Sequence, residues 1–257
     1  MTARIVPIAS ADDPRIEPYA RIRERDLVRG AKFVAEGEVV VRVLATRGRF
    51  RVDSLLLEER RVSTMGDVLD ALDVPAYVAP QAVMEAIAGF PIHRGILALG
   101  DRGAPLAPAD VRGPLVVGMI GLANHDNVGG IFRSAAAFGA SGVLVDATTC
   151  DPLYRKAIRV SVGGALVVPF AKCESADVML DALAGFEIFA LTPRGEEPLD
   201  VLRASRGDRA LLVGTEGEGL PDAVLARARR VRVAMGGAMD SLNVVVAASL
   251  ALHEATR

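Results

Sequence analysis

The most informative stretch of the chain reads NHDNVGGIFRSAAAFG, from Asn124 to Gly139, and directly follows an apolar run at 115–122. Such a run predicts a buried strand, and the polar, glycine-containing turn after it predicts the entry into a helix. In α/β proteins, a turn between a strand and a helix is a common place for ligands to bind. The stretch therefore predicts an α/β fold with a binding site at the end of this strand.

The predicted helix in this stretch has one apolar and one polar face. Asn127 is predicted to cap its start, since asparagine is a preferred N-cap residue. Arg133 lies about 200° around the helix from Ile131, where a cation is available for chemistry. A solvated arginine on an ordinary amphipathic helix explains this position equally well, so the segment alone leaves both interpretations open. The apolar face is formed at helical spacing by Val128, Ile131, Ala135 and Phe138.

Composition indicates a globular protein with a substantial core. The chain has 257 residues, 51% of them hydrophobic, and a formal net charge of −2. This length suits two modest domains or one large one, and the charge argues against a wholly basic nucleic-acid binder. A net charge of −2 is still compatible with a local basic surface. Basic residues crowd the first fifth of the chain, at Arg15, Arg21, Arg23, Arg25, Arg29, Lys32, Arg42, Arg47, Arg49 and Arg51.

This arginine-rich segment, 15–51, has two interpretations. Arginine is well suited to binding phosphates and to stacking on bases, which favours RNA contact. Acidic residues are interspersed among the arginines, for example at Glu17, Glu24 and Asp26, which favours a solvated helical face. The segment alone does not decide between them.

The longest apolar runs are too short or too interrupted for a membrane span, and the N-terminus has no extended apolar signal region. We therefore expect a cytoplasmic protein. Cys150 and Cys173 stand outside any Cys-x-x-Cys pattern, which is typical of thiols in a reducing compartment. The chain's histidines lack the spacing of metal ligands, so no metal site is predicted; they are His93, His125 and His253.

Two α/β domains are predicted, at 1–105 and 112–257. In the first, helices near 15–28, 38–45, 65–72 and 81–87 alternate with strands at 33–36, 52–57, 76–78 and 96–99. A segment rich in proline and glycine follows at 100–108 and is typical of a linker. In the second, strands are predicted at 115–120, 142–145, 187–191, 210–213 and 231–235. Helices between them favour a mainly parallel sheet with ligands at its carboxyl edge.

Two further motifs follow predicted strands of the second domain. The first is a glycine-rich turn, Gly214-Thr215-Glu216-Gly217-Glu218-Gly219-Leu220, which matches neither a phosphate-binding P-loop nor a dinucleotide-binding Gly-x-Gly-x-x-Gly. The second is Ser241-Leu242-Asn243, at the start of an apolar helix predicted at 242–255. Ser241 is predicted to cap this helix, although polar residues there equally suit contact with a small ligand. Each motif alone is compatible with a purely structural turn.

Together, the three motifs resemble the SpoU/TrmH family of RNA ribose 2′-O-methyltransferases, within the SPOUT superfamily. The match consists of Asn127-x-Gly129-x-x-x-Arg133, Gly214-x-Glu216-Gly217-x-Gly219-Leu220 and Ser241-Leu242-Asn243, in order and at the family's spacing, and it covers roughly 112–257. Residues 15–100 resemble, more loosely, the small substrate-binding domain of many members, which is related to a ribosomal-protein RNA-binding fold. That match includes Phe33-Val34-Ala35-Glu36-Gly37 and His93-Arg94-Gly95.

The resemblance implies a SPOUT-type α/β domain whose C-terminal part forms a deep trefoil knot. It also implies that S-adenosylmethionine binds in the knot, held mainly by backbone groups. The cofactor positions carried over from the family are Gly214, Val233 and Leu242. The chain has Val233-Ala234-Met235 where relatives often have Ile-Pro-Met, which removes a rigid proline but no chemical group.

The catalytic cluster implied by the resemblance consists of Asn127, Arg133, Glu216, Ser241 and Asn243. The family assigns the counterpart of Arg133 as the base, but a guanidinium stays protonated in proteins. We therefore expect Arg133 to hold the phosphate and to stabilise the developing alkoxide. Glu216 is expected to orient Arg133 through an ion pair, while the other three side chains place the ribose.

The resemblance further implies an RNA substrate and a homodimer. The additional N-terminal domain favours ribosomal RNA over transfer RNA. Two alternatives remain: a non-catalytic RNA-binding protein that retains the SPOUT fold, and a small-molecule enzyme that uses another nucleotide cofactor. Loss of Arg133, Ser241 or Asn243 would favour the first, and all three are present.

Overall fold

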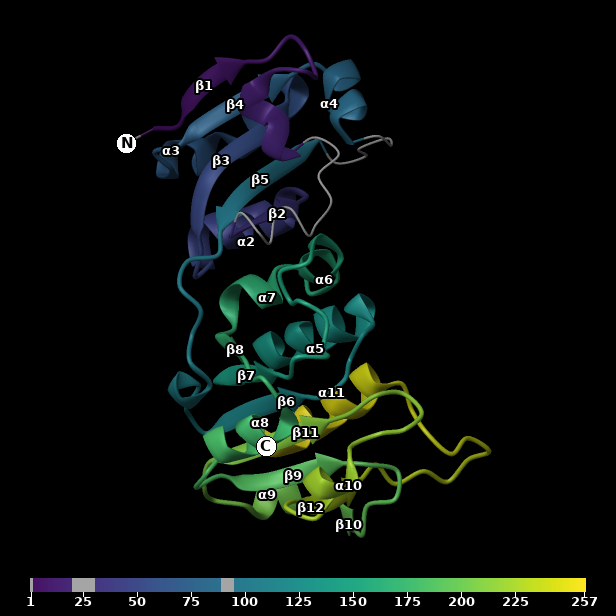
Figure 1. The fold of residues 1–257 in the computed structure, drawn as a ribbon. Coiled ribbons are helices and arrows are strands. Elements are labelled where there is room, and N and C mark those ends of the chain that lie inside the picture. The colour runs from purple at the N-terminus through teal and green to yellow at the C-terminus, as the bar shows by residue number, and fades with distance from the viewer. Residues whose placement is uncertain (1, 20–30, 89–94) are drawn as a thin grey trace. The chain divides into compact units, whose positions relative to one another are not determined.

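The computed structural model describes residues 2–19, 31–88 and 95–257, and these form two compact units (Figure 1). The first unit comprises Met1–Ala104 together with Leu153–Val167, and the second comprises Pro105–Pro152 together with Val168–Arg257. The cut after Ala104 falls in the proline- and glycine-containing segment. The sequence did not reveal that Leu153–Val167 packs with the N-terminal unit.

The first unit contains a five-stranded mixed sheet in the order β1-β4-β3-β5-β2. The strands are β1 (Arg4–Pro7), β2 (Lys32–Glu36), β3 (Arg51–Glu58), β4 (Pro75–Ala79) and β5 (Ile96–Asp101). The strands β1, β3 and β4 pair in parallel, whereas β5 is antiparallel to both β2 and β3. Within its described residues up to Ala104, this unit has the α-helices α2 (Glu38–Arg47), α3 (Gly66–Ala71) and α4 (Gln81–Ala88).

The predicted helix near 15–28 is only partly described. Its first residues form a 3-10 helix, η1 (Pro14–Tyr19), with Pro18 inside it, and 20–28 lie outside the described residues. Proline lacks the N–H that an α-helical hydrogen bond needs, which favours a short irregular turn. Arg21, Arg23, Arg25 and Arg29 therefore have no structural assignment.

The described cations of the arginine-rich segment are largely paired with carboxylates. Arg15 binds Asp13, Lys32 binds Asp53 and Asp101, Arg42 binds Glu38 and Asp67, and Arg51 binds Asp53 and Asp101. Most of these pairs are partly exposed, so each stabilises the fold only weakly. RNA contact by this segment stays a prediction.

The segment Leu153–Val167 carries α6 (Arg155–Val160) and α7 (Gly164–Val167) onto the first unit. The Arg49 N–H donates to the Leu166 carbonyl at 2.9 Å, which links the end of α2 to α7. A Cβ on Gly163, where φ is +85°, would lie 2.8 Å from Val43 Cγ1. This close approach explains why glycine occupies the turn between α6 and α7.

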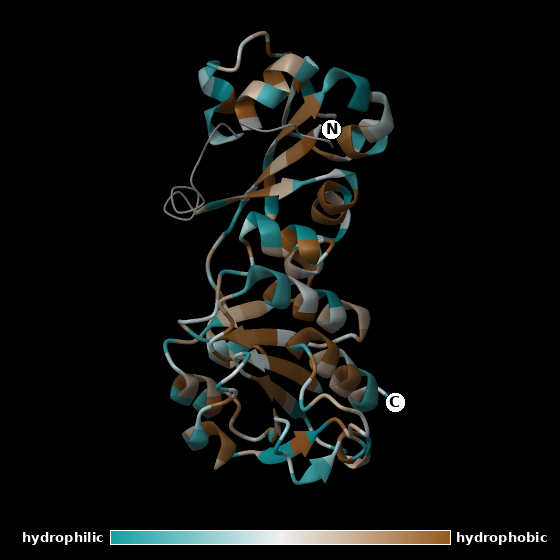
Figure 2. Ribbon diagram, turned by 90° about the vertical axis from the view of Figure 1, so that its right-hand side faces the viewer, coloured by the Kyte–Doolittle hydropathy of each residue, from teal (hydrophilic) through white to brown (hydrophobic). Residues whose placement is uncertain are grey.

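The second unit is built on a seven-stranded sheet in which every pairing is parallel. Its order is β10-β12-β9-β11-β6-β7-β8, with β6 (Leu115–Met119), β7 (Gly142–Val145), β8 (Phe170–Lys172), β9 (Glu187–Leu191), β10 (Glu197–Pro198), β11 (Arg209–Val213) and β12 (Arg229–Arg232). Parallel strands covered on both faces are apolar throughout, and β6 is buried along its whole length. Strands of this sheet are coloured as hydrophobic in Figure 2. The carboxyl ends of β6, β7, β9 and β11 therefore meet at one edge.

Two long helices of this unit pack against each other, and both begin at that edge: α5 (His125–Ala137) and α11 (Val244–Ala255). The remaining helices are α8 (Ala176–Ala182), α9 (Val201–Ala204) and α10 (Asp222–Leu225). On α5, Ile131 is buried and Arg133 is exposed, which confirms the predicted opposite faces. Among the described residues, no helix combines the length and apolar character needed to cross a bilayer.

Both predicted helix caps were wrong. The side chain of Asn124, not Asn127, caps α5 by accepting from the Asp126 N–H, and Asn127 is buried inside the first turn. Asn243, not Ser241, caps α11 by accepting from the Val245 N–H at 2.8 Å. Strand β12 also ends earlier than predicted, so Val233 lies in the loop. The trefoil knot depends on threading rather than strand order and stays a prediction.

Candidate active site

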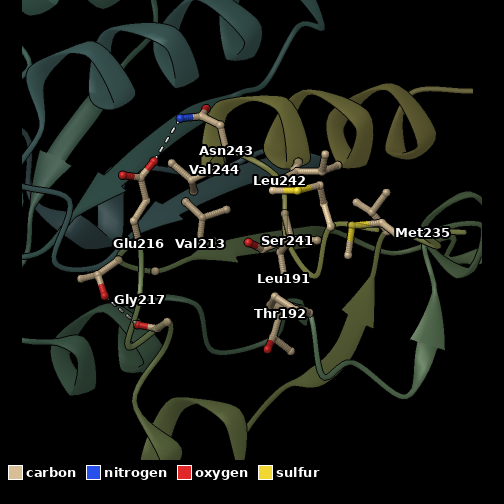
Figure 3. A pocket seen from close by; sticks show the side chains of 17 residues that line it. Leu191, Thr192, Val213, Glu216, Gly217, Met235, Ser241, Leu242, Asn243 and Val244 are labelled. Atoms are coloured by element: carbon tan, nitrogen blue, oxygen red, sulfur yellow. Dashed lines mark hydrogen bonds between the residues drawn. The ribbon is translucent and has the colours of Figure 1, made fainter. Parts of the chain in front are cut away.

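A cavity of about 500 Å³ lies at the carboxyl edge of the parallel sheet (Figure 3). Three loops surround it: the one after β9, the glycine-rich loop after β11, and the long loop between β12 and α11. Val213 and Leu191, the last residues of β11 and β9, form part of its wall. The position agrees with the predicted ligand site of a parallel sheet.

All three residues predicted to hold the cofactor line this cavity: Gly214, Val233 and Leu242. A Cβ on Gly214 would lie 2.5 Å from the backbone carbonyl of Gly219, which no small shift of a side chain can relieve. Gly219 and Gly217 have φ values of +75° and +104°, which favour glycine. The glycine-rich loop therefore folds back on itself, and its glycines border the cavity beside the side chain of Glu216.

Three of the predicted catalytic residues form one hydrogen-bonded network. The side-chain amides of Asn127 and Asn243 both donate to Glu216 Oε1, each at 3.0 Å. The Asn243 amide also approaches Asn127 Oδ1 at 3.2 Å. Asn127 is buried, whereas Glu216 and Asn243 are exposed and line the cavity. The network fixes polar groups from α5, the glycine-rich loop and α11 at one place.

Arg133 lies apart from this network. Its side chain is exposed, it does not line the cavity, and among the described residues it forms no ion pair with Glu216. The predicted ion pair is therefore absent, and the two amide donors engage Glu216 instead. The physical reason is helical geometry, since Arg133 follows Asn127 by six residues and their side chains therefore leave the helix in directions about 120° apart.

Ser241 lines the cavity and is exposed, at the end of the loop that leads to α11. Sequence reasoning missed the contribution of the loop after β9, where Leu191, Thr192 and Pro193 also line the cavity. The available signal was the predicted strand itself, because its carboxyl end meets those of β6 and β11. Met235 and Met239 were missed as well; both are exposed and border the cavity.

A buried carboxylate holds the turn that leads into α5. Asp146, at the end of β7, accepts from the Gly121 N–H at 3.0 Å and from the Thr149 N–H at 2.8 Å. Burial raises the pKa of this carboxyl, but hydrogen bonds from Gly121, Thr148 and Thr149 outweigh burial and leave it below 3.8. Asp146 thus stays ionised and positions the turn before Asn124. No metal-binding cluster of His, Cys, Asp or Glu occurs within the described ranges.

Comparison with known proteins identifies the class. The SpoU rRNA methylase family matches residues 114–253, the part that contains the parallel sheet and the cavity. The chain belongs to this family of RNA methyltransferases. It is 39% identical to an uncharacterized tRNA/rRNA methyltransferase of Mycobacterium tuberculosis, over 97% of this chain and 91% of the relative. A similar relative from Synechocystis is 26% identical over 100% of this chain and 96% of its own length.

Solved structures show the same fold over nearly the whole chain. An AdoMet-bound rRNA methyltransferase from Sinorhizobium meliloti has a TM-score of 0.83 at 22% identity, covering 98% of this chain and 97% of that one. A structure described as an RNA 2′-O ribose methyltransferase has a TM-score of 0.79 at 29% identity, covering 97% and 98%. The small mixed sheet followed by a parallel-sheet SpoU domain is thus a shared architecture.

Proposed function

We propose that the protein transfers a methyl group from S-adenosylmethionine to a ribose 2′-hydroxyl of RNA. The observation that carries this proposal is the cavity at the carboxyl edge, which joins the glycine-rich loop to the Asn127–Glu216–Asn243 network. The similarity to a structure described as an RNA 2′-O ribose methyltransferase supports the choice of the 2′-hydroxyl.

The cavity fits S-adenosylmethionine in size and chemistry. Its volume of about 500 Å³ lies within the usual range of small-molecule sites, roughly 300 to 1,000 Å³. Backbone groups around Gly214, Val233 and Leu242 would hold the cofactor, and the clash that a Cβ on Gly214 would cause shows how closely the backbone packs there. When bound, S-adenosylmethionine supplies an electrophilic methyl group.

The chain's own residues have distinct roles in this proposal. The Asn127–Glu216–Asn243 network positions the ribose for an in-line approach, because orientation alone accelerates such reactions strongly. Ser241, which also lines the cavity, would contact the same ribose. Arg133 is exposed and free of ion pairs among the described residues, so its guanidinium is available to bind the RNA phosphate and to stabilise an alkoxide.

A homodimer is part of the proposal. Val246 and Leu250 lie one turn apart on α11 and are 48% and 41% exposed. Large apolar side chains grouped on one helical face favour burial against another protein surface. A second copy of this chain is the proposed partner, and an interface there would lie on the helix that also carries Asn243.

We further propose ribosomal RNA as the substrate, with transfer RNA as the alternative, and the cytoplasm as the location. The N-terminal unit, rather than the methyltransferase unit, would select the RNA through phosphate contacts. The relatives support the class only, since their names include both tRNA and rRNA.

Methyl transfer from radiolabelled S-adenosylmethionine to purified ribosomal and transfer RNA tests the activity, and mapping 2′-O-methylation in a strain lacking the protein identifies the nucleotide. The expected result is incorporation into one RNA class that requires the intact 2′-hydroxyl. RNA binding without incorporation would favour the non-catalytic alternative. Preferential binding of NAD or ATP over S-adenosylmethionine would favour the small-molecule enzyme.

A further inference from the structure

A second cavity, of about 370 Å³, lies at the opposite edge of the parallel sheet. Its wall includes Leu115 and Arg209, the first residues of β6 and β11, so it is at the amino edge, away from the proposed cofactor site. The C-terminal end of α11, with Ala255, Thr256 and Arg257, completes the wall together with residues following α9.

Three arginines line this cavity: Arg203, Arg209 and Arg257. One carboxylate, Glu254, pairs with two of them, at 2.6 Å to Arg203 Nη2 and at 3.6 Å to Arg257 Nη1. Each guanidinium carries five N–H donors, so these two ion pairs leave most of the donors of Arg203 and Arg257 unused. The side chains around the cavity therefore carry an excess of positive charge.

Arg209 is only partly explained by its structural contacts. Its Nη1 donates to the carbonyls of Leu202 at 2.9 Å and Ala255 at 2.8 Å, and so ties the ends of α9 and α11 to the sheet. A cation at helix C-termini is favourable in itself. The Nε of the same side chain, however, is buried and has no hydrogen-bond acceptor among the described residues. Buried polar groups without partners are rare, and each one suggests a missing acceptor.

We propose that this cavity binds a phosphate group. Guanidinium groups bind phosphate oxygens through paired hydrogen bonds, and three arginines line this cavity, whose volume exceeds that of phosphate itself. The volume accommodates a phosphate together with an attached sugar. The phosphate comes either from the backbone of the RNA substrate or from a free phosphate ester. Only the RNA source rests on the proposed function.

The first test measures the binding of inorganic phosphate and of a nucleoside 5′-monophosphate to the full-length protein by calorimetry. Replacing Arg203→Gln and Arg257→Gln together is expected to weaken binding by about tenfold or more, because charge-assisted hydrogen bonds are removed. The matched control is Arg206→Gln, an exposed arginine nearby that does not line the cavity, and it should leave binding unchanged. Equal phosphate binding by the double variant and the wild type would overturn the proposal, as would undetectable binding by the wild type.

Arg209→Lys provides a second variant, which keeps the charge but removes the paired donors. Because Arg209 also holds α9 and α11, the melting temperature of the Arg209→Lys protein is measured alongside its phosphate affinity. If this variant unfolds, the double variant at Arg203 and Arg257 decides the test.

The second test separates the two sources of phosphate through the salt dependence of RNA affinity. If the RNA backbone occupies the cavity, the double variant should flatten the slope of log K against log salt concentration by roughly 0.7 to 0.9 for each phosphate that it no longer neutralises. If a free phosphate ester occupies it, the slope stays unchanged while phosphate binding falls. Neither measurement involves methyl transfer, so an inactive protein that binds phosphate here would refute the proposed function and leave this site intact.

Discussion

The side-chain amide of Asn243 lies 3.2 Å from Asn127 Oδ1, although 116 positions separate the two residues in the sequence. Asn243 also accepts from the Val245 N–H, so a single side chain both caps α11 and joins the network around Glu216. The start of α11 and the first turn of α5 are thereby held in one geometry. Stability and the proposed activity therefore depend on the same residue.

The substitution Asn243→Ala is expected to reduce both the stability of the protein and the proposed methyl transfer. Loss of a helix cap costs about 1 kcal/mol, which for a protein of this size corresponds to a fall of roughly 2 to 4 °C in melting temperature. Thermal unfolding measures this effect, with Ser241→Ala as the control. Ser241 is exposed and does not cap the helix, so that variant should melt like the wild type. Identical melting of Asn243→Ala would show that the cap is not needed.

Arg133→Ala should abolish methyl transfer and leave the affinity for S-adenosylmethionine within a few-fold of the wild type. The reason is that Arg133 is exposed and does not line the proposed cofactor cavity. Calorimetry gives the affinity and the radiolabel assay gives the transfer. Comparable turnover by the variant and the wild type would remove Arg133 from the mechanism, whereas abolished cofactor binding would place it in the cofactor site.

Gly214→Ala should weaken S-adenosylmethionine binding by about tenfold or more, because the new Cβ would meet the Gly219 backbone at 2.5 Å and the loop must move. Gly236→Ala is the matched control. It lies in the loop after β12, and a Cβ there would have no atom within 4 Å. Calorimetry on both variants measures the difference, and equal affinities would contradict a backbone-lined cofactor site.

Asp146 makes the stability of the second unit sensitive to acid. Its folded-state pKa lies below 3.8, so its contribution is fully present above that value and is lost as the pH falls through the folded pKa. Asp146→Asn should reduce the free energy of unfolding at pH 6 by about 1 to 3 kcal/mol, since buried hydrogen bonds are removed. It should also make the decline below pH 3.8 shallower. Urea unfolding at several pH values tests this, with the exposed Asp240→Asn as the control.

The homodimer prediction concerns Val246 and Leu250. Replacing both by lysine should convert a dimer to a monomer in sedimentation experiments at micromolar concentration, because buried charge opposes association. The melting temperature of the isolated monomer should change little, since both side chains are exposed in the single chain. Val178→Lys, at an exposed apolar position on α8, is the control. A wild-type protein that sediments only as a monomer would contradict the proposed homodimer.

The central strands were predictable, whereas three of the four edge strands and both helix caps were not. Strands such as β6 and β11 are buried on both faces, so their apolar runs identify them directly. The missed strands β1, β8 and β10 are edge strands of two to four residues, which pair on one side only and have weak sequence patterns. The caps were misplaced because candidate residues of the same type stand close together, as Asn124 and Asn127 do.

Much of the candidate site was predictable as motif residues, but its contacts and the position of Arg133 were not. The motif positions Gly214, Val233 and Leu242 came from family resemblance, and the structure brings all three to one cavity. The predicted ion pair between Glu216 and Arg133 was wrong. The partner of Glu216 depends on which face of α5 meets the glycine-rich loop, and tertiary packing decides that. The loop after β9 was missed because its residues carry no distinctive chemistry.

The packing of Leu153–Val167 with the N-terminal unit affects how the chain folds during synthesis. Domains generally fold as units as they leave the ribosome, N-terminal first. Here the N-terminal unit is complete only when residue 167 has emerged, after β6, α5 and β7 of the second unit have already been synthesised. When the first unit becomes complete, those three elements still lack the other strands of their sheet, which are synthesised later. Genetic recombination at residue 104 would therefore deprive the first unit of Leu153–Val167, whereas every residue of the second unit would stay on the C-terminal piece.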